Sequence, residues 1–164
     1  MNIKMILVWP LAFITMLFSL AFPPKAQGDI SAVYAWHGGS GATTEFKVDL
    51  ERKNLWRFEG PGFARRDEEA LFDGFCFIGR LNGRKIAAFL EAADENGFID
   101  WEGRYAPEEP NGPGFGSWHV TVVFTDGTKK ESNGYRSSTH GPAGYAAMAA
   151  AFKALTGMDI LANV

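Results

Sequence analysis

The sequence predicts an α+β domain, with an antiparallel sheet of about five strands and two amphipathic helices packed on one face. Segments that read as short strands gather at 30–58 and 118–132. Segments with helical periodicity follow each of these groups, at 84–94 and 142–156. Strands and helices that are grouped in this way, without β–α–β alternation, are typical of α+β domains.

Three short strands are expected in the first group. Residues 30–36 are rich in β-branched and aromatic side chains, and residues 44–50 and 55–58 alternate between apolar and polar side chains. A glycine-rich turn at 38–41 and a polar turn at 51–54 separate these segments. Three antiparallel strands are the simplest interpretation.

The next segment, 70–81, shows no clear period and is compatible with either a strand or a helix. The single cysteine of the chain, Cys76, lies there between Phe75 and Phe77. A free cysteine in such apolar surroundings usually behaves as a small core residue, so we expect Cys76 to be buried. A reactive thiol or an intermolecular bridge is the alternative.

Two helices are expected, each with one apolar stripe. Asn82 is a suitable cap for the first helix, and Gly97 would end it. Pro142 opens the second helix and Gly157 ends it. The outer face of the second helix is mostly alanine, which suits packing against a second surface. The stripes consist of Ile86, Phe89, Leu90 and Ala93 in the first helix and Tyr145, Met148, Phe152 and Leu155 in the second.

The clearest strand spans 118–125, where apolar and polar side chains alternate. Asp126 and Gly127 follow it and favour a two-residue hairpin turn, because both residues tolerate positive φ. The returning strand, 129–132, is polar on both faces, which suits an edge strand guarded by charge. Trp101 and Trp118 each open a strand whose alternation points them into the core.

The N-terminal segment has the layout of an export signal. A single early lysine, Lys4, precedes an uncharged, largely apolar run from Met5 to Pro24, and small residues at Ala26 and Gly28 suit cleavage before Asp29. We therefore expect a signal peptide at 1–28 and one domain at 29–164, exported to the periplasm or secreted. An uncleaved membrane anchor is the alternative, since the run approaches the length that crosses a bilayer.

The charge of the predicted domain argues against a nucleic-acid partner. The whole chain has a formal net charge of −3, and residues 1–28 hold two lysines and no acid, so the remainder carries −5. Binding to a nucleic-acid backbone requires a basic surface.

Motifs for catalysis and metal binding are incomplete. The segment 94–100 resembles part of a calcium loop, but Ala92 and Gly103 occupy the first and last ligand positions. The histidines lack metal-ligand spacing, and no Gly-x-Ser-x-Gly nucleophile motif occurs. We expect no metal, no cofactor and no assigned catalytic residue. One catalytic hypothesis stays open, a carboxylate pair, Asp100 and Glu102, acting with His119.

Aromatic residues beside glycine-rich loops are typical of surfaces that bind sugars or peptides. Such residues occur beside the turn at 38–41 and in the proline- and glycine-rich loop at 105–116. We predict that these two loops form a ligand-binding surface. The predicted ligand contacts are Trp36, His37, Tyr105 and Phe115.

The C-terminal half resembles a small uncharacterised bacterial domain family. The family reads helix, Trp-x-Gly, Trp-x-x-x-x-x-Phe-x-Asp-Gly, and then a glycine and a proline before a closing helix. The matching residues are Trp101, Gly103, Trp118, Phe124, Asp126, Gly127, Gly134, Pro142 and Tyr145. The resemblance implies an α+β domain of unknown function and assigns no site residue.

The expected function is that of a binding or interaction module of the cell envelope or extracellular space, with a protein, peptide or saccharide as its ligand. The sequence leans away from an enzyme. A small envelope hydrolase is the first alternative. A structural or inhibitory partner protein, which uses the alanine face of the second helix or the strand at 129–132, is the second.

Overall fold

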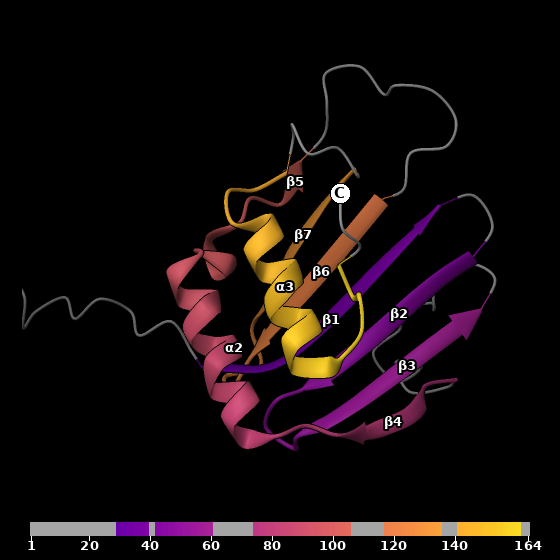
Figure 1. The fold of residues 1–164 in the computed structure, drawn as a ribbon. Coiled ribbons are helices and arrows are strands. Elements are labelled where there is room, and N and C mark those ends of the chain that lie inside the picture. The colour runs from indigo at the N-terminus through magenta and orange to yellow at the C-terminus, as the bar shows by residue number, and fades with distance from the viewer. Residues whose placement is uncertain (1–28, 40–41, 61–73, 106–116, 136–140, 162–164) are drawn as a thin grey trace, which may run out of the picture.

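The computed structural model describes residues 29–39, 42–60, 74–105, 117–135 and 141–161. Seven strands, two α-helices and one 3₁₀ helix make up this part of the chain (Figure 1). The strands are β1 (Ile30–Gly39), β2 (Ala42–Asp49), β3 (Asn54–Gly60), β4 (Cys76–Arg80), β5 (Arg104–Tyr105), β6 (Ser117–Phe124) and β7 (Lys129–Tyr135). The helices are α2 (Gly83–Glu95), η1 (Phe98–Asp100) and α3 (Tyr145–Thr156).

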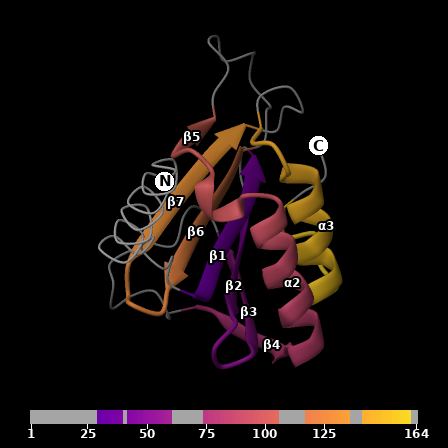
Figure 2. The ribbon, with the colours of Figure 1, turned by 90° about the vertical axis from the view of Figure 1, so that its left-hand side faces the viewer.

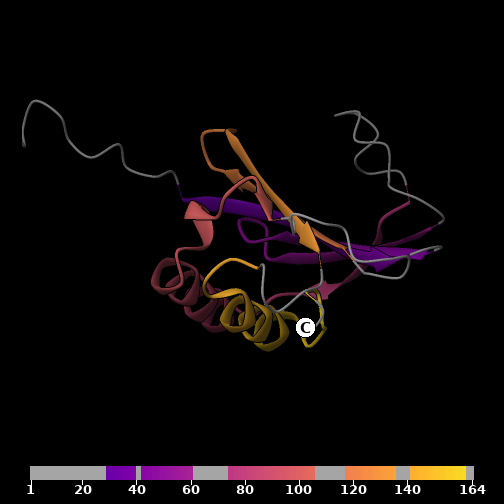
Figure 3. The ribbon, with the colours of Figure 1, turned by 90° about the horizontal axis from the view of Figure 1, so that it is seen from above.

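The strands form one mixed sheet in the order β4-β3-β2-β1-β6-β7-β5. Every neighbouring pair is antiparallel except β5 with β7, which is parallel. Both α-helices lie on the same side of this sheet (Figures 2 and 3). The α+β class is therefore confirmed, whereas the expectation of about five antiparallel strands is wrong.

Two strands account for the difference. The segment whose period was unclear forms β4, an edge strand with a bulge where it pairs with β3. β5 has only two residues and pairs at Asn133 and Gly134 with the end of β7. Two residues are too few to show an alternating pattern. The strand expected at 129–132 is therefore part of the longer strand β7, and β5 pairs with the C-terminal end of β7.

The helix signals in the sequence are confirmed except for Pro142, which precedes the second helix instead of opening it. The side-chain oxygen of Asn82 accepts hydrogen bonds from the backbone N–H of Arg84 at 2.9 Å and of Lys85 at 3.4 Å, as an N-terminal cap does. Gly97 lies just beyond α2 with a φ of 58°. α3 begins three residues after Pro142, and Gly157 ends it with a φ of 78°.

The hairpin between β6 and β7 differs from the expected two-residue turn. The N–H of Gly127 donates to the carbonyl oxygen of Phe124 at 2.9 Å, and the N–H of Phe124 donates to that of Thr128 at 2.9 Å. The hydrogen bond between Phe124 and Thr128 therefore closes a loop of three residues, 125–127. Only the last of them, Gly127, has a positive φ, of 82°, which is the usual pattern of a three-residue hairpin loop.

The core fills the space between the helices and one face of the sheet. Aromatic rings dominate it, and Trp101 and Trp118 are buried as expected. Trp101 does not open a strand, because it follows η1 directly and β5 begins only at Arg104. The rings of Phe89 and Phe152 have their centroids 4.8 Å apart, and those of Trp101 and Trp118 5.7 Å apart. The sheet contributes Val33, Ala35, Phe46, Val48, Leu55, Trp118, Val120, Val122 and Phe124, and the predicted helix stripes contribute Ile86, Phe89, Ala93, Tyr145, Met148, Phe152 and Leu155.

Two glycines permit close packing around this core. A Cβ atom on Gly134 would lie 2.8 Å from the ring of Trp118. Gly144 precedes α3 with a φ of 83°, and a Cβ atom there would lie 2.8 Å from the Cβ of Asn96. A larger residue at either position would therefore force its neighbours to move.

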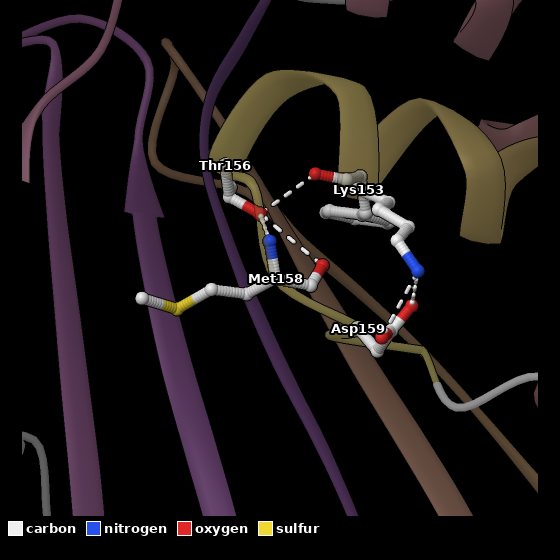
Figure 4. Close-up of polar contacts among 5 residues, drawn as sticks. Lys153, Thr156, Met158 and Asp159 are labelled. Atoms are coloured by element: carbon white, nitrogen blue, oxygen red, sulfur yellow. Dashed lines mark hydrogen bonds and ion pairs between the residues drawn. The ribbon is translucent and has the colours of Figure 1, made fainter.

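Polar contacts hold the chain after α3 against the end of that helix (Figure 4). The hydroxyl of Thr156 donates to the carbonyl oxygen of Phe152 at 2.7 Å and accepts from the N–H of Met158 at 3.1 Å. Lys153 pairs with Asp159 at 2.9 Å. These contacts lead into Ile160 and Leu161, which are buried.

Cys76 is exposed, so the expectation that it fills the core is wrong. It begins β4, and the side chains of Phe77 and Ile78 after it are exposed as well. The apolar composition of this segment suggested the core, but β4 lies at the edge of the sheet.

We expect a water-soluble maleimide to modify Cys76 completely in the folded protein, because an accessible thiol does not require unfolding to react. Intact mass measured before and after treatment, without denaturant, checks this. The Cys76→Ala variant should gain no mass. Modification that occurs only in denaturant would contradict the exposed position.

Candidate functional site

The candidate site lies on the face of the sheet that neither α2 nor α3 covers, which we call the helix-free face. Core residues such as Val33, Val48 and Val120 point toward the helices, so their neighbours in each strand point to the other side. Strand pairing places these neighbours opposite one another across the central strands. The residues concerned are Tyr34 and Trp36 of β1, Glu45, Lys47 and Asp49 of β2, Trp56 and Phe58 of β3, and His119 and Thr121 of β6.

Three charged residues follow one another along β2 on this face, and we call Glu45, Lys47 and Asp49 the acid–lysine row. Their exposed fractions are 3%, 6% and 7%. The Nζ of Lys47 lies 3.7 Å from a carboxylate oxygen of Asp49. The other oxygen of Asp49 accepts a hydrogen bond from the N–H of Arg52 at 2.8 Å. Asp49 thus joins the row to the turn between β2 and β3.

Burial of these charges is energetically costly. Removing an ion from water costs several kcal/mol, and pairing returns only part of this cost. Neither α-helix covers the helix-free face, so packing of the helices does not explain why charged groups are buried there (Figure 3). Packing in the helix-side core therefore does not account for the burial of the acid–lysine row, which is energetically unfavourable.

Tyr34 and Lys47 are direct neighbours across β1 and β2. The Nζ of Lys47 lies 5.6 Å from the centre of the Tyr34 ring, within the range of a cation–π contact. Burial raises the pKa of the Tyr34 phenol, and the negative charges of Asp49 and Glu45 raise it further. Burial also lowers the pKa of Lys47, although Asp49 opposes this effect. Ionisable groups with shifted pKa values often mark functional sites.

Trp36 and His119 form the second part of the site. Their rings are nearly parallel, with an interplanar angle of 6° and centroids 6.0 Å apart. The Nε2 of His119 and the hydroxyl oxygen of Thr121 are 3.1 Å apart, at hydrogen-bonding distance. Trp36 also pairs with Glu45 on β2, so the stacked rings lie next to the acid–lysine row.

Aromatic rings border the row on its other side. Trp56 pairs with Lys47 across β2 and β3, and its ring meets that of Phe77 on β4 edge to face at 5.2 Å. The ring of Phe58 lies 5.7 Å from that of Phe75. The acid–lysine row thus runs between aromatic side chains of β1 and β3.

The structure does not bring the four predicted ligand contacts together. Trp36 lies on the helix-free face, whereas His37 is opposite Trp118 and points to the helix side. Tyr105 packs on the ring of Trp118 at 6.0 Å, and its hydroxyl oxygen accepts a hydrogen bond from the N–H of Glu102 at 2.7 Å. Phe115 lies outside the described residues. Trp36 and Tyr105 are therefore on opposite faces of the sheet.

The residues of the hydrolase hypothesis occupy different environments. His119 is buried against Trp36 on the helix-free face. Asp100 and Glu102 are exposed, and they belong to the segment that connects α2 with β5. Among the described residues, no group of three or more histidine, cysteine, aspartate or glutamate side chains is arranged to hold a metal ion.

Most of the candidate site was missed in the sequence. The signal was present, because Glu45, Lys47 and Asp49 alternate with the apolar stripe of the same strand. Such alternation usually means a strand with one face in solvent. The sequence gives no sign that the polar face of this strand is buried.

The fold and the site together define an α+β domain with a buried charged row on the helix-free face of a mixed sheet. No protein-family model matches the chain, and no curated protein or solved structure matches it. The resemblance of the C-terminal half stays a prediction. Within the described residues, no helix is both long and apolar enough to cross a membrane.

The Tyr34 phenol should titrate above its usual pKa of about 10, because burial and the two carboxylates disfavour the phenolate. Ultraviolet absorbance measured against pH, with the Tyr34→Phe variant subtracted, checks this. Asp49→Asn should lower the pKa more than Glu45→Gln does, since Asp49 is the larger of the two charge effects. An unchanged pKa in both variants would contradict the arrangement.

The raised pKa of Tyr34 makes the stability of the fold depend on pH. The folded state holds the Tyr34 proton more tightly than the unfolded chain does. This contribution to stability is fully present below pH about 10 and is lost as the pH rises through the folded-state pKa.

Proposed function

We propose that this protein is an exported, single-domain binding module of the cell envelope or extracellular space. Its proposed ligand contacts are the half-buried side chains of Tyr34, Trp56 and Phe58 on the helix-free face. They lie beside the acid–lysine row and the stacked pair of Trp36 and His119. The observation that carries the proposal is the burial of Glu45, Lys47 and Asp49 on the face that the helices leave uncovered. Trp36 is the one residue shared with the surface expected from the sequence.

The cost of the charged row supports a functional role. A core built from apolar side chains is already present on the helix side, and replacing a buried ion pair with apolar residues is often neutral or stabilising. Charges that do not serve stability are commonly retained for recognition or chemistry. The shifted pKa values of Tyr34 and Lys47 agree with this interpretation.

The chemical character of the site favours a peptide or a saccharide as the ligand. The half-buried rings of Trp56 and Phe58 offer flat apolar surfaces, and the groups beside them supply both hydrogen-bond donors and acceptors. The row holds two carboxylates and one ammonium group. Its charges therefore complement neither a strongly anionic nor a strongly cationic ligand. This mixture suits a ligand with many polar groups and little net charge.

Calorimetric titration of the chain from Asp29 onward, against short peptides and oligosaccharides, tests the proposal. A saturable ligand should bind Tyr34→Phe about two- to tenfold more weakly, because a hydrogen bond between neutral groups is worth about 0.5–1.5 kcal/mol. Glu102→Gln, which changes an exposed side chain outside the site, is the control and should bind normally. Equal binding by both variants, or no saturable ligand, would remove the proposal.

Export is tested separately by expressing the full chain in a bacterium and measuring the intact mass in each cell fraction. A mass that begins at Asp29, in the periplasm or medium, is expected. A full-length mass in the membrane fraction would instead favour an N-terminal anchor. Neither result depends on the binding experiment.

A further inference from the structure

We draw no further inference here: the strongest candidate, the edge strand β4 with the exposed apolar side chains of Phe77 and Ile78, carries nothing, because nothing in the part of the chain that the structure describes shows what covers it.

Discussion

Replacing Asp49 with alanine should destabilise the domain by about 3 kcal/mol, because it removes a carboxylate that pairs with the buried ammonium group of Lys47. The same change removes the acceptor for the N–H of Arg52 in the turn after β2. Urea unfolding followed by circular dichroism measures the free energy of unfolding directly.

A second change separates the charge from the turn. In the double variant Asp49→Ala, Lys47→Met, the ammonium group is removed together with the carboxylate, so much of the lost stability should return. The exposed pair of Lys153 and Asp159 is the matched control. Its side chains are about half exposed, and Asp159→Ala should cost less than about 1 kcal/mol. If Asp49→Ala and Asp159→Ala lower the free energy of unfolding equally, the acid–lysine row is not buried.

Replacing Phe152 with alanine should cost about 3–5 kcal/mol, the usual range for truncating a buried phenylalanine. Its side chain is fully buried, and its ring lies 4.8 Å from that of Phe89 and 5.8 Å from that of Phe98. The cavity would open between both helices and the 3₁₀ helix. Urea unfolding again gives the measured loss.

The matched control for this change is Phe77→Ala. Phe77 is 51% exposed, so the same chemical truncation should cost less than about 1 kcal/mol. If Phe152→Ala does not fold, Phe152→Leu keeps most of the volume and should cost less than about 1.5 kcal/mol. A loss at position 152 no larger than at position 77 would contradict the packing described.

The helices could be predicted from the sequence because their signals are local. Asn82 caps the first helix and Gly157 ends the second, and each signal depends on residues within one or two turns. A strand was expected to open at Trp101, but β5 spans only Arg104–Tyr105. Its bounds could not be predicted, since they depend on its pairing with Asn133 and Gly134. The exposure of Cys76 could not be predicted either, because an apolar segment does not reveal whether its strand lies at a sheet edge.

The candidate site was less predictable than the fold. Trp36 was identified from its position beside a glycine-rich turn, but Lys47 appeared as an ordinary polar residue of an alternating strand. Its contact with Tyr34 depends on the register between β1 and β2. Register is a tertiary property, set by the pairing of whole strands.

The position of β1 at the centre of the sheet has a consequence for how the chain folds. β1 pairs on one side with β2, its neighbour in sequence, and on the other with β6. The hydroxyl of Ser31 reaches the carbonyl oxygen of Val123, 92 residues away. This ladder joins the two parts of the sheet, so a large loop must close before the sheet is complete. Such non-local pairing slows folding.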